Sequence, residues 1–165
     1  MSRGFVKEDD QEETPIIPPR AALPASVINY VTPNGMQQLK AEKEALEQER
    51  GNLTTDDEQQ RRRDLAVLDG KMGLLVERIA SARIINAKDQ PQNEIRFGAT
   101  VKIKINGNLQ QFQIVGVDEA DVTQHKIAFV APIATTITGK KVGDRVDFKL
   151  GPELRRIEIL GISYF

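Results

Sequence analysis

A chain of 165 residues with a formal net charge of −1 has room for one or two small domains. This charge balance excludes wholesale electrostatic binding to nucleic acid, although a local patch could still act. The absence of cysteine excludes disulfides and thiolate chemistry, and the single histidine, His125, gives no support for a multi-histidine metal site. No apolar run reaches the roughly 18–20 residues that span a membrane, and the first residues lack a signal-peptide core, so we expect a cytoplasmic protein without a membrane contact.

Residues 1–31 have the composition of an extended or disordered N-terminal arm. Residues 7–13 are dense in charge, and the prolines that follow favour extended backbone because they lack an N–H donor. One interpretation is a disordered tail. The alternative is an arm that packs on the domain or on a partner, anchored by Phe5, Ile16 and Ile17.

Residues 32–86 are predicted to form an antiparallel hairpin of two helices. The first helix is expected over 34–50, capped by Thr32 or Asn34, and the second over 55–86, capped by Thr54 or Thr55. Apolar residues recur at alternating spacings of three and four, which is typical of a coiled-coil seam. The seam residues are Leu39, Leu46, Leu65, Leu68, Met72, Leu75 and Ile79.

After a linker at 87–96, the pattern changes to that of strands. Apolar and basic residues alternate from Val101 to Ile105, and Asn106-Gly107 is a strong hairpin-turn signal. Further strands are expected near 126–130, 145–150 and 155–161, with a short helix over 132–138. Residues 97–165 therefore form a sheet domain, and the fold class is α+β.

Three stretches of this sequence resemble the Gre-factor (GreA/GreB) family of bacterial transcription cleavage factors. The segment from Phe97 to Phe165 contains IVGVDEAD and PIATTITGKKVGDRV in the order and spacing of the family's C-terminal domain. The stretches YVTPNGMQQLKAEKEAL and GKMGLLVERIASARII are similar to the two ends of its helical hairpin. The resemblance implies an N-terminal antiparallel α-helical coiled-coil hairpin followed by a C-terminal FKBP-like β-sheet domain with a short helix.

The resemblance also implies a partner, which is RNA polymerase. In Gre factors the hairpin enters the secondary channel of polymerase, and acidic residues at its tip help to hold a metal ion that activates water for RNA cleavage. The sheet domain docks at the rim of that channel. We expect the docking surface here to include Asp118, Glu119, Asp121, Pro132 and Ile133.

The tip of the hairpin departs from the family pattern. An ungapped alignment from the end of the second helix places the two acidic tip positions on Gly51 and Thr54, and neither is a carboxylate. The hairpin is also shorter than the family's by about 15 residues, which over two helices at about 1.5 Å per residue removes roughly 11 Å of reach. Metal ligation tolerates errors of only tenths of an ångström, so this loss would not be absorbed by side-chain flexibility.

Asp56, Asp57 and Glu58 are the candidates for replacement tip acids. They have three interpretations: acids that stabilise the N-terminus of their own helix, a displaced metal-binding tip, or an acidic contact to polymerase. The basic run Arg61, Arg62 and Arg63 has two: a solvated helix face with ion pairs to the preceding acids, or a contact with nucleic acid or an acidic channel wall.

The function expected from these observations is that of a Gre-type elongation regulator, with weak or no stimulation of transcript cleavage. It would be a monomeric accessory factor without a cofactor or metal of its own, and any RNA cleavage would take place in the polymerase active site. One alternative is a genuine cleavage factor that uses Asp56 and Asp57. A second is an FKBP-like peptidyl-prolyl isomerase, which would need an aromatic-lined proline pocket.

Overall fold

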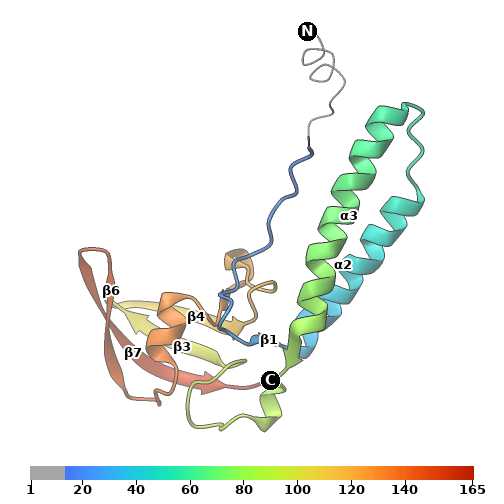
Figure 1. Cartoon of the computed structure of the whole chain (residues 1–165). Coiled ribbons are helices and arrows are strands. Elements are labelled where there is room, and N and C mark those ends of the chain that lie inside the picture. The colour runs from blue at the N-terminus through green and yellow to red at the C-terminus, as the bar shows by residue number, and fades with distance from the viewer. Residues whose placement is uncertain (1–13) are drawn as a thin grey trace.

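The computed structural model describes residues 14–165 of the chain. Figure 1 shows a helical hairpin that projects from a sheet domain, with the N-terminal arm running beside both. Phe5, one of the predicted arm anchors, lies outside the described residues. None of the helices within 14–165 is both long enough and apolar enough to cross a membrane. The predicted α+β fold, a helical hairpin followed by a sheet domain with a short helix, is confirmed.

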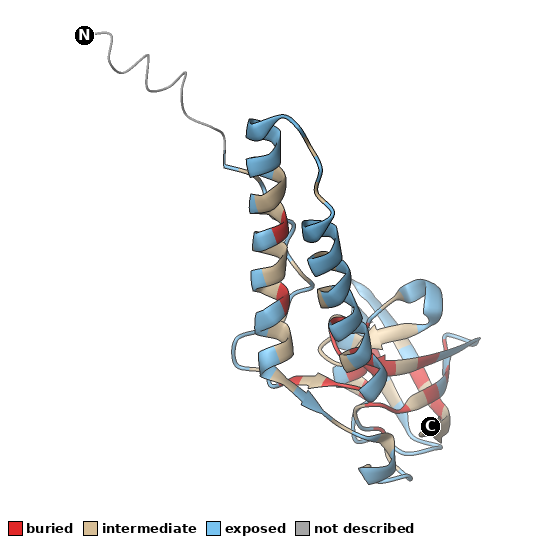
Figure 2. Ribbon diagram, turned by 90° about the vertical axis from the view of Figure 1, so that its right-hand side faces the viewer, coloured by how far each residue is buried: buried red, intermediate tan, exposed pale blue. Residues whose placement is uncertain are grey.

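The hairpin consists of α2 (Pro33–Gly51) and α3 (Glu58–Ser81). Thr32 caps α2 by accepting a hydrogen bond from the N–H of Gly35, and Pro33 occupies the first helical position, where a missing N–H costs nothing. The predicted seam is confirmed at its centre, because Leu39, Leu68 and Leu75 are buried, and Leu39 and Leu75 pack in one apolar cluster. Figure 2 shows the buried and half-buried positions as a stripe along α3 that ends before the hairpin tip.

The second helix is shorter at both ends than predicted. It begins at Glu58 because Asp57, and not Thr54 or Thr55, caps it. It ends at Ser81 because the next residues form β2 (Ala82–Ile84), which pairs in parallel with β1 (Asn29–Val31) at the end of the arm. The pairing partner lies more than 50 residues away in the chain, which local helix propensity could not reveal.

The sheet domain follows a short helical turn, η1 (Ala87–Asp89). Its strands have the spatial order β5-β4-β3-β7-β6, and only the β4–β5 pair is parallel. The remaining elements are β3 (Thr100–Ile105), β4 (Asn108–Val115), η2 (Val122–Gln124), β5 (Lys126–Ala128), α4 (Pro132–Ile137), β6 (Arg145–Leu150) and β7 (Glu153–Ser163).

One face of this sheet forms the main core of the domain. Val101, Ile103 and Ile105 alternate with exposed lysines along β3, and they pack with Phe112 and Ile159 from the neighbouring strands. Helix α4 adds Ala134 and Ile137 to the same core. The predicted turn at Asn106-Gly107 joins β3 to β4, and both residues have the positive φ that such a tight hairpin requires.

The segment predicted as a linker is partly core. Ile95 is fully buried with the sheet residues, and its N–H donates to the carbonyl of Lys140. The sheet domain therefore begins before Phe97. The sequence placed its start too late because the alternation typical of a strand begins only after the buried Ile95.

The buried seam predicts the effect of shortening one leucine. Leu75→Ala removes a side chain with 0% exposure, and we expect it to lower the free energy of unfolding by about 2–4 kcal/mol. The adjacent Val76 is 43% exposed, so Val76→Ala should change it by no more than about 0.5 kcal/mol. Urea denaturation followed by circular dichroism measures both. Equal losses for the two variants would contradict the assigned seam.

Candidate functional site

The hairpin tip carries the acidic cluster predicted from the sequence. Asp57 has its Oδ1 atom 3.0 Å from the backbone nitrogen of Gln59 and 3.3 Å from that of Gln60, and it accepts a hydrogen bond from each. Asp56 and Glu58, like Asp57, are exposed. The structure thus gives Asp57 a capping role at the positive end of α3, where a carboxylate is favourable.

The tip does not assemble a metal site from its own side chains. Within residues 14–165 no three acidic or histidine side chains come together in a way that could hold a cation. Asp56 and Asp57 are neighbours in the chain, so any ion at the tip would need most of its oxygen ligands from another molecule. Gly51 and Thr54, the positions that the sequence analysis compared with the family's acids, have no carboxylate.

The basic run lies on the first turns of α3, close to the tip. Arg61, Arg62 and Arg63 are all exposed, and consecutive residues on a helix point in different directions. They therefore cannot all face a single flat surface. Both interpretations of this run, a solvated face and a contact with nucleic acid or polymerase, remain predictions.

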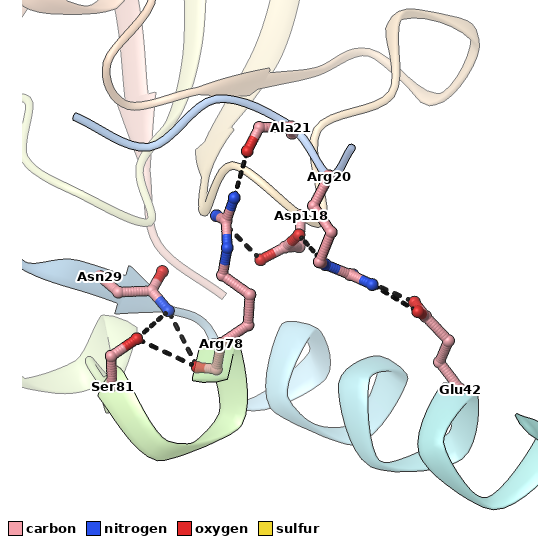
Figure 3. A network of polar contacts seen from close by, with 7 residues as sticks. All are labelled: Arg20, Ala21, Asn29, Glu42, Arg78, Ser81 and Asp118. Atoms are coloured by element: carbon pink, nitrogen blue, oxygen red, sulfur yellow. Dashed lines mark hydrogen bonds and ion pairs between the residues drawn. The ribbon is translucent and has the colours of Figure 1, made fainter. Parts of the chain in front are cut away.

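Unlike the exposed hairpin tip, the turn that begins at Asp118 is enclosed, at the place where the arm, the hairpin and the sheet domain meet. Only 7% of the Asp118 side chain is exposed. Its Oδ1 atom accepts a hydrogen bond of 3.0 Å from Nε of Arg20 in the arm, and its Oδ2 atom lies 3.4 Å from Nη1 of Arg78 on α3. Figure 3 shows Arg20 and Arg78 converging on this carboxylate.

The two arginines reach further than Asp118. The guanidinium of Arg20 also donates two hydrogen bonds to the carboxylate of Glu42 on α2, and that of Arg78 donates to the backbone carbonyl of Ala21. The hydrogen bond to Glu42, reinforced by Asp118, raises the pKa of Arg20 above its ordinary value despite partial burial. Neither arginine could be predicted as a site residue from the sequence, because isolated arginines in an arm and on a helix follow no recognisable pattern.

Glu119 is even more deeply enclosed than its neighbour. Its side chain is 3% exposed, and it accepts hydrogen bonds from the hydroxyl of Thr32 and from Nδ2 of Asn34 at 2.8 Å. Nζ of Lys126 lies 3.3 Å away and supplies the compensating charge. A buried carboxylate is tolerated only with such partners, so Glu119 ties the start of α2 to the sheet domain.

The predicted docking residues thus separate into two groups. Asp118 and Glu119 are used within the chain, whereas Pro132 is exposed and Asp121 and Ile133 are half-buried. Asp121 accepts hydrogen bonds from the hydroxyl and the backbone N–H of Thr123, and these lower the pKa of its carboxyl. His125, next to this turn, is exposed and has a left-handed backbone conformation.

An aromatic cluster completes the junction. The rings of Tyr30, Phe97 and Phe129 lie with their centroids 5.4–5.8 Å apart, mostly edge to face. Tyr30 belongs to β1, and the two phenylalanines belong to the sheet domain, so the cluster joins the hairpin base to that domain. The hairpin base has its own smaller core of Val31, Leu39 and Leu75.

The chain is thus a two-domain protein, in which a helical hairpin with an acidic tip is fixed by its base to a small sheet domain. The family model described as "Transcription elongation factor, GreA/GreB, C-term" matches residues 90–164. The transcription elongation factor GreA of Thermodesulfovibrio yellowstonii is 30% identical over 151 residues, a match that covers 81% of this chain and 96% of that protein. The chain therefore belongs to the GreA/GreB family of transcription elongation factors.

Other relatives match over different lengths. GreA of Hyphomonas neptunium is 34% identical over 99 residues, and that match spans 59% of this chain and 63% of the relative. GreB of Neisseria meningitidis serogroup B (strain MC58) is 28% identical over 153 residues, with 82% and 94% covered. The matches to GreA of Thermodesulfovibrio yellowstonii and to GreB of Neisseria meningitidis cover nearly the whole relative. In each, the alignment is longer than the number of residues that this chain contributes to it, so the alignment contains gaps in this chain.

Two solved structures match this chain at lower sequence identity. The crystal structure of GreA factor homolog 1 (Gfh1) of Thermus thermophilus is 20% identical and covers 81% of this chain and 97% of that one, with a TM-score of 0.38. The elongation factor GreA/GreB from Nitrosomonas europaea is also 20% identical, with 82% and 98% covered and a TM-score of 0.40.

The enclosed position of Glu119 predicts a large structural effect. Glu119→Ala leaves Lys126, the buried hydroxyl of Thr32 and the part-buried amide of Asn34 without their acceptor, and we expect it to lower the free energy of unfolding by about 3–5 kcal/mol. Glu153→Ala, in the exposed ion pair with Arg155, should cost no more than about 1 kcal/mol. Thermal and urea unfolding of the two variants provide the comparison. Similar stabilities would mean that Glu119 does not join the hairpin to the sheet domain.

Proposed function

We propose that this protein binds RNA polymerase at the secondary channel and regulates elongation, with weak or no stimulation of transcript cleavage. The observation that carries this proposal is the chemistry of the tip. Asp57 already caps its own helix, and Gly51 and Thr54, on which an ungapped alignment places the family's acidic positions, carry no carboxylate. The protein would act as an accessory factor, and any cleavage would be performed by polymerase itself.

The geometry of metal ligation supports the same proposal. Oxygen ligands of Mg²⁺ lie about 2.0–2.1 Å from the ion, so a carboxylate displaced by several ångströms contributes no bond. Gaps on the side of this chain in the full-length family matches agree with a shortened hairpin. A shorter hairpin would hold its tip acids away from the ion even if they were otherwise suitable.

For docking we propose the accessible part of the predicted surface, Asp121, Pro132 and Ile133. These residues are close to the surface, whereas Asp118 and Glu119 are used internally. Pro132 and Ile133 form the first turn of α4, a position that is rigid because Ala134 and Ile137 of the same helix are buried in the core. A rigid, partly apolar patch is suited to a protein partner.

A second candidate function, genuine stimulation of cleavage, rests on one observation. Asp56 and Asp57 are both exposed at the tip, and the hydrogen bonds to Asp57 engage only its Oδ1 atom. Its Oδ2 atom is therefore available to an ion held mainly by polymerase. The cleavage experiment below separates the two functions.

Transcript cleavage in backtracked elongation complexes is expected to stay near the rate of polymerase alone when this protein is added. Asp56→Asn and Asp57→Asn should leave that rate unchanged, and both should fold normally, since asparagine caps a helix about as well as aspartate. The rate of RNA shortening is measured on gels, with an active cleavage factor as positive control. Fast cleavage that Asp57→Asn abolishes would replace our proposal with the second candidate function.

Binding to core polymerase is expected to depend on the accessible patch. The double variant Asp121→Asn with Pro132→Ala should raise the Kd by about tenfold or more, as expected when residues at the centre of an interface are altered. Lys149→Ala, an exposed change on β6, serves as the control and should leave the Kd unchanged. Fluorescence anisotropy of a labelled chain measures these constants. No binding by the wild-type chain at micromolar concentration would overturn the proposed partner.

A further inference from the structure

Two adjacent residues of the arm contact the sheet domain and both helices of the hairpin. Arg20 bridges Asp118 in the sheet domain and Glu42 on α2, and Ala21 accepts a hydrogen bond from Arg78 on α3. The contact between Arg20 and Asp118 is enclosed, because their side chains are only 17% and 7% exposed, whereas Glu42 at the other end of the bridge is 44% exposed. Both oxygens of Asp118 are occupied, one by the arm and one by the hairpin.

A second contact fixes the arm further along α3. Ile17 packs against Gly70 so closely that a Cβ atom at position 70 would lie 2.3 Å from Cδ1 of Ile17. Gly73, three residues later on the same helix, has no atom within 4 Å of such a Cβ. The arm therefore explains only one of the two glycines of α3. The predicted anchor Ile17 is used, whereas Ile16 is 89% exposed.

Two separate attachments hold the hairpin on the sheet domain. The first is the base, where Glu119 binds Thr32 and Asn34 and where Tyr30 of β1 packs on two phenylalanine rings of the sheet domain. The second is the arm, which crosses from Asp118 to both helices. A single attachment at the base would leave a pivot, and a second attachment at another place removes that freedom.

We propose that the arm is a strap, defined as residues 14–28, that sets the angle of the hairpin on the sheet domain, with Arg20 and Asp118 as its positioning residues. Figure 3 shows the group at its centre, in which a single carboxylate joins the arm to α3. The 24 residues of α3 extend about 36 Å at about 1.5 Å each, so a change of about 10° at the base would move the tip by roughly 6 Å. The strap therefore decides where the tip would lie on polymerase.

The absence of cysteine from the chain makes a direct distance measurement possible. Asn52→Cys at the hairpin tip and Lys149→Cys on β6 are exposed positions for two spin labels, and pulsed electron paramagnetic resonance gives the distance distribution between them. We expect a single narrow distribution for the otherwise wild-type chain. Arg20→Met and Asp118→Asn should each broaden it roughly twofold or more, because a released hairpin samples several angles.

Two matched pairs control for general effects. Arg155→Met removes an arginine from an exposed ion pair within β7, outside the strap, and should leave the distribution narrow. Gly70→Ala and Gly73→Ala raise helix propensity equally, but only Gly70→Ala displaces Ile17, so only it should broaden the distribution. Far-UV circular dichroism confirms that each variant is folded.

This distance measurement tests the strap independently of the proposed function, because it needs no polymerase. Narrow, unshifted distributions in folded Arg20→Met and Gly70→Ala would overturn the strap, even if Asp118→Asn failed to fold. Broadened distributions in both, with narrow ones in Arg155→Met and Gly73→Ala, would support it. The strap's effect on the tip in a transcription complex rests on the proposed function, and failure of polymerase binding would leave the intramolecular result intact.

Discussion

The adjacent carboxylates of Asp118 and Glu119 are the constraint on which the arrangement of the molecule depends. Burying a charged side chain is costly unless opposite charges and hydrogen-bond donors surround it. Asp118 meets this requirement with arginines from the arm and from α3, and Glu119 meets it with a lysine and with groups at the start of α2. Two neighbouring residues on one turn thus require all three parts of the chain to be in place.

As a consequence, the orientation of the helical hairpin is set by contacts at its base. The two domains have separate buried apolar cores, and the aromatic cluster of Tyr30, Phe97 and Phe129 is the apolar contact described between them. Apolar burial is not directional, so it would allow several hairpin angles, whereas hydrogen bonds to charged groups have narrow geometry. The polar junction therefore contributes orientation, while the cores contribute most of the stability.

This division of roles also changes the interpretation of the acidic residues. In a family whose tip acids serve a metal, acids near a turn invite a functional assignment. Here Asp57 caps a helix, and Asp118 and Glu119 join domains. A surface for polymerase has to be sought among the residues that these internal roles leave accessible, such as Pro132.

The sequence by itself determined most of the elements and the family. The three-four spacing of leucines defined the hairpin, the alternation at 101–105 and the Asn106-Gly107 turn defined the first pair of strands, and the motifs of residues 97–165 carried the resemblance. These features are local, because each depends on residues within a few turns or strands of one another. Local patterns predict periodic structure well for this reason.

Only the tertiary structure decided which charged residues are internal. The pairs Arg20–Asp118 and Thr32–Glu119 join residues 98 and 87 positions apart, and no spacing in the sequence signals such contacts. The same holds for the end of α3, which stops where β1 offers backbone partners, and for Gly70, whose place on a helix is explained by Ile17 of the arm. A buried carboxylate and an exposed one have the same letter in the sequence, and they differ only in the donors that the fold brings to them.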